Sequence, residues 1–392
     1  MLGDRSLFPN LVTRAYLDHA AISPLSEPVR RAAHQVVDSF AERGVGAQLE
    51  WMEQQGRLRQ KLASLIGAEP DSIAFVANTT RGVTDIALCI PWRAGDRVLL
   101  FKGEFPANVT PWQRAAELFG LEVIWLPCPS AHDEEAVWLD RVAHTLETSA
   151  PRVMAVSAVQ FQTGLRMPLA ALGGLCGRYG TELFVDAIQA CGVVPIDVRR
   201  ERIDYLACGS HKWLMGLEGV AFLYVAPERA GALVPRVAGW LSHDDALAFL
   251  FEGPGRLRYD RPIRRRADFV EGGMPNTTAL AALEAAVDLL LQIGIENIRA
   301  HVGRYLDALE PELTGLGLSS CRARELARRS GIASFAAPAD IDVIALHRAI
   351  DRRIVSCTTP DGLLRFSPHW PNALEEVPLV VAEIAAALER AR

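Results

Sequence analysis

The sequence predicts an α/β fold with a large domain, built on a mostly parallel sheet of the seven-stranded type between helices, and a smaller α+β domain. Through the first two-thirds of the chain, short β-rich runs alternate with segments of helical period. Such alternation requires crossover connections, which favour parallel strands with helices on both faces. The 392 residues also suffice for two hydrophobic cores, since single cores stop growing near roughly 250–300 residues.

The alternation can be followed element by element. Strands are expected over 72–76, 97–101, 123–126, 153–157, 183–186, 204–208 and 220–225. Helices are expected over 80–89, 108–119, 134–146 and 168–179. The segment 240–266 is polar and irregular, which indicates a long loop region.

The rest of the chain is expected to form the smaller domain. Apolar residues at helical spacing over 278–293 predict a long helix that leaves the large domain, and another helix is expected over 374–390. A helix over about 26–43 is expected to pack on this second lobe. We expect the large domain to span 15–265, and the small domain to combine 1–14 with 266–392.

Composition excludes several classes of protein. The net charge of −6 argues against general binding of nucleic acids or acidic membranes. No charge-free apolar run reaches the roughly 18 residues of a membrane span, and the N-terminus lacks a signal-peptide pattern. The seven cysteines include no CxxC pair, so neither a disulfide framework nor a metal site is predicted. We expect a cytoplasmic protein.

The feature that points most directly to chemistry is a carboxylate and a lysine at two strand ends. The apolar run 183–186 closes on Asp186, and the run 204–208 is followed by Lys212. In an open α/β sheet, ligands bind outside the carboxyl ends of the strands. Pyridoxal phosphate uses such a pair, a lysine for its Schiff base and an acidic partner for its ring nitrogen. The alternative is ordinary, because many strand-end aspartates cap helices and most lysines are solvated.

Three other features fit a phosphate-bearing cofactor and a carboxylate substrate. Hydroxyls and free N–H groups over 77–82 open a helix, which makes an anion site, although such caps occur on ordinary helices too. His211 is placed to add a donor there. Phe105 follows a strand and could lie over a planar ring, although a lone aromatic is more often a core residue. Arg365 lies in an apolar strand, where either a substrate carboxylate or a structural ion pair would hold it.

Seven short motifs occur in the order expected of one enzyme superfamily and extend over nearly the whole chain. They are Tyr16-Leu17-Asp18-His19-Ala20-Ala21, Asn78-Thr79-Thr80, the segment 104–112, Asp186-Ala187-Ile188-Gln189, Ser210-His211-Lys212, the segment 271–276, and Arg365-Phe366-Ser367-Pro368-His369. On these motifs the chain resembles the fold-type I pyridoxal phosphate enzymes of the class V aminotransferase and cysteine desulfurase-like superfamily. The resemblance implies the PLP-dependent transferase fold, with pyridoxal 5′-phosphate as cofactor.

The resemblance also implies a role for each motif. Lys212 and Asp186 are implied to be catalytic. Contacts with the cofactor are implied for Asn78, Thr79, Thr80, Phe105, Asp186, Gln189, His211, Lys212 and the Met274 loop. Contacts with an amino acid substrate are implied for Ala20, Ala21 and Arg365. It further implies a homodimer with the active site at the subunit interface, where the Met274 loop reaches the partner's phosphate.

The chain departs from the pattern of the superfamily at two positions. Met274 stands where Thr or Ser is usual, so the partner subunit is expected to offer a backbone N–H, with Thr277 or Thr278 as possible help. Phe161 stands where many desulfurases carry Asn. We assign the lost contact to Gln160 in preference to Gln162, and we expect only one of the two to point inward.

The motifs favour a class V aminotransferase acting on an amino acid through Lys212, but they leave other outcomes open. These are a C–S or β-lyase, a cysteine desulfurase, an amino-acid epimerase and, remotely, a non-catalytic scaffold. A desulfurase needs a mobile, reactive cysteine, and Cys357 is the only candidate near the right region. Its apolar surroundings oppose the lowered pKa that such a role requires, so the desulfurase ranks lower. The side chain of the substrate is not indicated.

Overall fold

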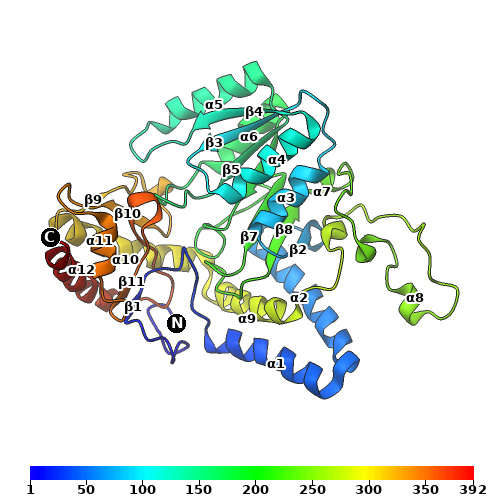
Figure 1. Cartoon of the computed structure of the whole chain (residues 1–392), viewed down its shortest axis with the longest axis horizontal. Coiled ribbons are helices and arrows are strands. Elements are labelled where there is room, and N and C mark those ends of the chain that lie inside the picture. Colours follow the sequence, from blue (N-terminus) through cyan, green and yellow to red (C-terminus); the bar gives the residue numbers. More distant parts are fainter.

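The large sheet of the computed structural model, which describes residues 1–392, has seven strands in the order β2-β8-β7-β6-β5-β3-β4 (Figure 1). The strands are β2 (Ile73–Val76), β3 (Arg97–Lys102), β4 (Glu122–Pro127), β5 (Val153–Ser157), β6 (Glu182–Asp186), β7 (Tyr205–Gly209) and β8 (Ala221–Val225). Strand β8 runs opposite to the other six strands, which all point in the same direction. The predicted fold class is therefore confirmed.

Side chains alternate between two hydrophobic cores, one on each face of the sheet. Leu183 and Val185 of β6 point into one core and Phe184 into the other. Helices α3 (Thr79–Cys89) and α4 (Thr110–Phe119) cover the Phe184 face. The opposite face is covered by α2 (Gln48–Ile66), α5 (Glu135–Ser149), α6 (Leu169–Tyr179) and α9 (Thr277–Ile293). Because both faces are covered, the strands read as continuous apolar runs.

Helix boundaries in this part follow local chemistry. The Asn78 side chain accepts a hydrogen bond of 2.8 Å from Arg81 N and so caps α3, and Asn276 caps α9 in the same way at 3.1 Å. Helices α2, α4 and α6 end at Gly67, Gly120 and Gly180, all in the left-handed region that glycine adopts without strain. These caps fix where the helices begin and end.

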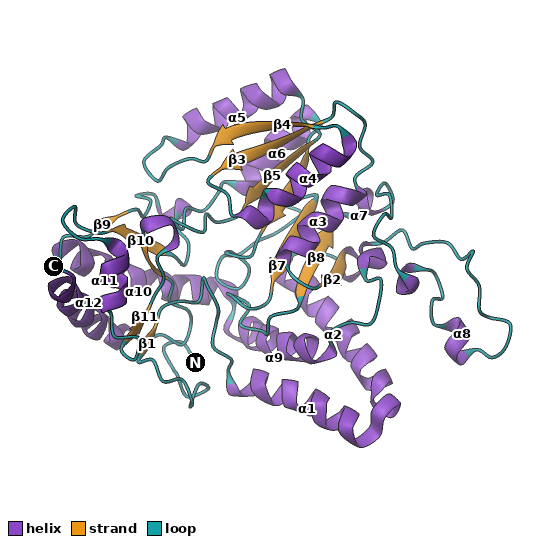
Figure 2. Cartoon of the chain, in the orientation of Figure 1, coloured by secondary structure: helices purple, strands orange, loops and turns teal.

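The C-terminal part forms a smaller α+β lobe (Figure 2). Its elements are α10 (Ile295–Gly315), β9 (Ser319–Ser320), β10 (Ala333–Ala336), α11 (Val343–Ala349), β11 (Val355–Ser356), β12 (Leu364–Phe366) and α12 (Val377–Ala391). Strands β12, β10 and β9 form an antiparallel sheet, and β11 pairs in parallel with β1 (Ala15–Tyr16). The expected domain boundaries at 14/15 and 265/266 stay predictions. Strand β1, which directly follows the first boundary, pairs with β11 of this lobe.

Two segments differ from expectation or extend it. Helix α1 (Glu27–Arg43), expected on the second lobe, packs along α9, where Val29 meets Ala282 and Ala286; α9 lies within 266–392 but itself covers the large sheet. The irregular segment 240–266 projects away from the body and contains only the short helix α8 (Ala248–Phe251) and a 3₁₀ turn, while α7 (Pro227–Ala230) precedes it (Figure 1). No single helix is long and apolar enough to cross a membrane; α9 and α10 pass that test only as a pair bent by 78°.

Candidate active site

The carboxyl ends of five strands that run in the same direction lie at one edge of the large sheet, and most of the predicted residues follow them. Thr79 comes after β2, Phe105 after β3, and Gln160 after β5, while Asp186 closes β6 and Lys212 follows β7. Register places Asp186 beside Ser157 of β5 and Ala207 of β7. Ligands in open α/β sheets bind at such an edge.

Asp186 is buried, Lys212 is half-buried, and the charges of the two side chains act on each other across the β6–β7 boundary. Burial lowers the pKa of Lys212 to about 8, although the charge of Asp186 works in the opposite direction. Burial likewise raises the pKa of Asp186 to about 6, against the effects of a 3.0 Å hydrogen bond from Ile188 N and of the Lys212 charge. Near neutral pH the Asp186 carboxylate is therefore mostly ionised, and the pKa at which the Lys212 amine loses its proton lies only slightly above that pH.

The residues at the start of α3 offer donors to a phosphate. The Thr79 hydroxyl is buried and has no hydrogen-bond partner in the protein, although buried polar groups are nearly always paired. A Cβ atom at Gly209 would lie 3.1 Å from Thr79 Oγ1 and 3.4 Å from His211 Cε1, so glycine keeps this space open. Thr80 is exposed, and Asn78 already uses its oxygen as the helix cap. The unpartnered hydroxyl and the helix N-terminus fit a phosphate group.

Phe105 provides an aromatic face beside the lysine. The Lys212 ammonium nitrogen lies 5.6 Å from the centroid of the Phe105 ring, which is partly exposed. Phe161 packs edge-to-face against the same ring, with centroids 5.2 Å apart. A planar cofactor bonded to Lys212 would be held next to the Phe105 ring, and Phe161 fixes the orientation of that ring.

Glu104 is a buried carboxyl to which sequence reasoning gave no role. It accepts hydrogen bonds from the backbone N–H of Ser157 at 2.7 Å, from the Ser157 hydroxyl, and from Gln160 Nε2 at 3.3 Å. Burial, helped by the nearby charge of Asp186, raises its pKa to about 7 against the effect of the hydrogen bonds from Ser157. Its place directly after a strand, like that of Asp186, was the signal that could have revealed it.

As expected, only one of the two glutamines after β5 points inward; the cause is the turn over 161–163, since strand alternation would have placed Gln160 and Gln162 on the same face. Gln160 is buried and bonds Glu104, whereas Gln162 donates a 2.6 Å hydrogen bond to Asp361 at the surface. Contact between Gln160 and a cofactor stays a prediction, since its amide nitrogen already has one partner.

The backbone around Lys212 is held by side chains from two distant segments. Ser23 Oγ donates to the Lys212 carbonyl at 2.6 Å, and His19 Nδ1, 2.7 Å from Ser23 Oγ, must therefore carry the proton it shares with that oxygen. His369 Nε2 lies 2.9 Å from the Trp213 carbonyl. These bonds fix the backbone position from which the Lys212 side chain extends.

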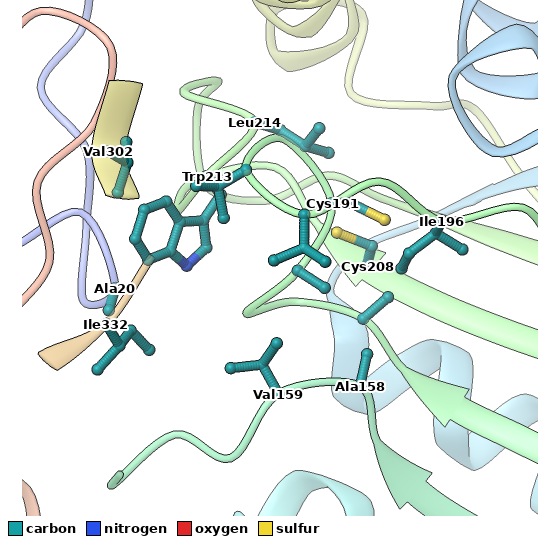
Figure 3. Close-up of a cluster of buried hydrophobic side chains, with 14 of the residues drawn as sticks. Ala20, Ala158, Val159, Cys191, Ile196, Cys208, Trp213, Leu214, Val302 and Ile332 are labelled. Atoms are coloured by element: carbon teal, nitrogen blue, oxygen red, sulfur yellow. The ribbon is translucent and has the colours of Figure 1, made fainter. Parts of the chain in front are cut away.

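Trp213 anchors the same turn in the core. Its indole lies near Ala20 and Ile332 (Figure 3), and its N–H donates a 2.8 Å hydrogen bond to Gln189 Oε1. The Gln189 amide donates in turn to Ala20 O at 3.0 Å. Gln189 thus has a structural role in joining the N-terminal motif to the lysine turn, and its expected contact with the cofactor stays a prediction.

Arg365 is buried and oriented by groups that it contacts without forming a close ion pair. Its Nε and Nη2 atoms donate to Thr358 Oγ1 at 3.2 and 3.0 Å, and Nη1 donates to Phe161 O at 2.8 Å. The Thr358 hydroxyl in turn donates a 3.0 Å hydrogen bond to Asp18 Oδ1. Three of the five guanidinium N–H groups are used, which leaves two donors for a ligand.

Asp18 balances part of this charge from nearby, and no local sequence signal pointed to its pairing with Thr358. Burial raises the pKa of Asp18 to about 6, and Arg365 acts against that rise. The structural ion pair that competed with substrate binding as an explanation of Arg365 is thus present only in a longer, threonine-bridged form. The guanidinium keeps free capacity for a carboxylate.

Four further residues of interest lie at different depths. Ala20 is buried, and its N–H donates to Ser367 Oγ at 3.0 Å, while Ala21 is partly exposed. Met274 is 61% exposed on the loop 271–276, as a residue offered to a second subunit would be. Cys357 is buried, and burial raises the pKa of its thiol far above the usual range. A reactive thiolate needs the opposite environment.

Comparisons with known proteins agree with this geometry. A family model described as aminotransferase class-V matches residues 15–362. An uncharacterised aminotransferase, YcbU, of Bacillus subtilis (strain 168) is 31% identical over 385 residues, which cover 97% of this chain and 96% of that protein. A probable cysteine desulfurase of Pyrococcus abyssi (strain GE5 / Orsay) is 27% identical over 380 residues, covering 92% and 91%.

Solved structures share the same fold. The complex of the cystine C–S lyase C-DES with its reaction product cysteine persulfide superimposes with a TM-score of 0.85 at 23% identity, and the match covers 96% of this chain and 99% of the lyase.

Proposed function

Because the chain belongs to the aminotransferase class-V family and is a pyridoxal phosphate-dependent enzyme, we propose that it transfers the amino group of an amino acid, with Lys212 as the catalytic amine. The observation that carries the proposal is that Asp186 and Arg365 both lie close enough to Lys212 for their charges to act on it, with no reactive cysteine beside them. A fold alone would not require all three.

Residues at the start of α3, together with Asp186, bind the cofactor. Thr79 and the N–H groups that open α3 hold the phosphate, with His211 beside them. One oxygen of Asp186 accepts from Ile188 N, so the other is free to pair with a protonated ring nitrogen. Bound there, pyridoxal phosphate supplies a carbonyl that condenses with amines and a ring that accepts the electron pair left at the α-carbon.

Lys212 acts in two ways. Its amine would hold the bound cofactor and, once a substrate amine had taken that place, would stand free beside the α-carbon of the substrate. With its pKa lowered to about 8, the freed Lys212 amine is a base near physiological pH. It can take the proton from the α-carbon and deliver it to a different atom. Arg365 binds the carboxylate of the substrate through its two free N–H groups, and this orients the α-carbon bond that breaks.

The cysteines disfavour the desulfurase alternative. All seven are free thiols, and five are buried. Burial raises the pKa of the two half-buried ones, Cys128 and Cys321, as it does that of Cys357. Since sulfur transfer to a protein thiol needs an accessible thiolate, a lyase that releases its product directly is the stronger second candidate.

Two finer points belong to the same proposal. We infer a homodimer in which the loop 271–276, with the exposed Met274, reaches the phosphate of the partner subunit, because this copy presents that loop to solvent. We also place the enzyme in the cytoplasm, because seven thiols without a disulfide suit a reducing compartment.

A half-reaction tests the proposed chemistry. Protein loaded with pyridoxal phosphate is mixed with each amino acid in turn, without a keto-acid acceptor, and its absorbance spectrum is followed. An aminotransferase converts the cofactor stoichiometrically into its stable amine form, and the amino acid that responds is the donor. If the original band persists while pyruvate, ammonia or sulfide accumulates, the enzyme is a lyase and the proposal is wrong.

A further inference from the structure

The segment 240–266, here called the arm, projects from the large domain near β2 and has no part in the active-site geometry (Figures 1 and 2). Its two legs are bonded to each other. Asp244 N donates to Pro262 O at 2.9 Å, and Arg264 N donates to Ser242 O at 3.0 Å. His243 and Ile263 thereby form an antiparallel β-bridge. The hydrogen bonds between the two legs make the arm an ordered extension of the fold.

The tip of the arm exposes large apolar side chains that nothing in this chain covers. Leu250, Phe251, Leu257 and Tyr259 are between 54% and 88% exposed, and every residue from 249 to 260 is at the surface. Soluble monomers rarely display contiguous apolar patches of this kind. Aromatic side chains next to arginines, here Arg256 and Arg258, are the composition typical of protein–protein contacts.

A second apolar patch lies where α1 turns into α2, over residues 37–53, here called the elbow. Val45 is 86% exposed and Leu49 69%, with Val37 and Met52 beside them. The elbow is rigid, because Trp51 is buried beneath it and donates a 2.9 Å hydrogen bond to Ser39. It too is apolar without a partner in this chain.

The elbow and the arm as a whole carry net charges of opposite sign. The elbow has four acidic residues and one arginine, namely Asp38, Glu42, Arg43, Glu50 and Glu53. The part of the arm from 244 to 266 has six arginines and four acidic residues. Opposite net charge around apolar centres is the complementarity expected of two surfaces that meet.

We propose that the arm of one copy packs on the elbow of a second copy, and that the second arm packs reciprocally on the first elbow. A contact between unlike patches of identical chains is made twice and closes when a two-fold axis relates the copies. Both patches lie toward the same end of the molecule (Figure 1). The inference rests on the proposed homodimer and names the surface that forms it.

The base of the arm connects this contact with the loop 271–276. Leu241 N donates to Gly272 O at 3.3 Å, and a Cβ at Gly239 would lie 2.2 Å from Gly272 O, so the two glycines allow backbones to touch. Docking of the arm therefore also holds the loop that carries Met274 toward the second copy. Loss of the arm contact should weaken cofactor binding as well as association.

Sedimentation of the cofactor-loaded protein over a dilution series tests the proposal. The double variant Leu250→Ser/Phe251→Ser and the elbow variant Leu49→Ser should each raise the dimer dissociation constant by roughly tenfold or more, since truncation of buried anchors dominates interface energies. Leu118→Ser, at a 62% exposed residue of α4, is the matched control and should leave association unchanged. Dimers that persist unchanged in both test variants overturn the inference.

A cross-link identifies the two surfaces directly. Phe251→Cys and Leu49→Cys proteins are purified separately, mixed, and treated with a short bis-maleimide. The expected result is a covalent dimer in the mixture and none in either mixture with wild-type protein, where only the native cysteines compete. No excess of cross-linked dimer in the mixture contradicts the arm–elbow contact.

The same experiments separate this inference from the proposed chemistry. A wild-type protein that stays monomeric at all concentrations overturns the arm contact and the homodimer together. Attachment of pyridoxal phosphate to Lys212, followed by its spectrum, is measured independently, and its absence would instead overturn the proposed function.

Discussion

The substitution Asp186→Asn should have opposite effects on folding and on cofactor binding. In the protein without cofactor, the Asp186 carboxylate is buried, and only Ile188 N and the Lys212 charge favour its ionised form. Asparagine keeps the shape and an oxygen acceptor for Ile188 N but removes the buried charge. It also removes the group that would keep the ring nitrogen protonated.

The magnitude follows from linkage. Burial raises the pKa of Asp186 from 3.8 to about 6, so the folded protein binds a proton more tightly than the unfolded chain. Stability is therefore lost as pH rises from about 3.8 through about 6, by about 3 kcal/mol in all, since each factor of ten in proton affinity is about 1.4 kcal/mol. An unpaired amide N–H₂ of the new asparagine offsets about 1 kcal/mol or more of this gain.

Urea unfolding of the cofactor-free proteins measures the effect. At pH 8 the variant should be about 1–2 kcal/mol more stable than wild type, and this advantage should shrink by about 1 kcal/mol at pH 5, where most wild-type molecules hold the proton. Affinity for pyridoxal phosphate should fall by about a hundredfold or more, because a buried hydrogen-bonded charge pair is lost. A variant that is less stable than wild type at pH 8, or one whose advantage does not change with pH, would refute the reasoning.

Three further predictions concern other parts of the site. Arg365→Lys should raise KM for the amino acid by about tenfold or more and leave the cofactor spectrum unchanged, because lysine cannot make the bidentate contact; an unchanged KM contradicts this role. Thr79→Val should weaken binding of pyridoxal phosphate by about tenfold and leave the apoprotein equally stable or more so, since its buried hydroxyl has no protein partner; calorimetry and titration check both halves. Because the pKa of Lys212 is about 8 and only the neutral amine reacts, attachment of the cofactor should accelerate about fivefold from pH 7 to pH 8 and less than twofold from pH 8 to pH 9. A tenfold rise per pH unit through pH 9 would indicate an ordinary solvated lysine.

The sequence predicted the large sheet closely because its strands are buried on both faces and read as apolar runs. The strands expected over 153–157 and 183–186 match β5 and β6 to within one residue, and their ends place Asp186 correctly. Such runs also show where each strand ends, and the carboxyl ends carry the chemistry. The convergence of the site could thus be predicted before any contact was known.

The contacts that orient those residues could not be predicted in the same way. Thr358 meets Arg365 and Asp18 only because β12 and the N-terminal motif lie side by side, and nothing local marks a single threonine. The packing of α1 on α9 depends on which apolar faces remain free after the sheet has formed. Gln189 looked available for the cofactor, yet Trp213 and Ala20 bind its amide. Each of these depends on tertiary neighbours far away in sequence.

The central claim is that Lys212 carries the cofactor, and one measurement tests it most directly. The chain has three lysines, of which Lys61 is held by Glu284 and Asp288 and Lys102 is exposed at the end of β3. The protein loaded with pyridoxal phosphate is reduced with borohydride and digested, and the modified peptide is identified by mass. We predict modification of Lys212 alone, abolished in Lys212→Ala and retained in Lys102→Arg. Modification of another lysine, or of none, would contradict the account.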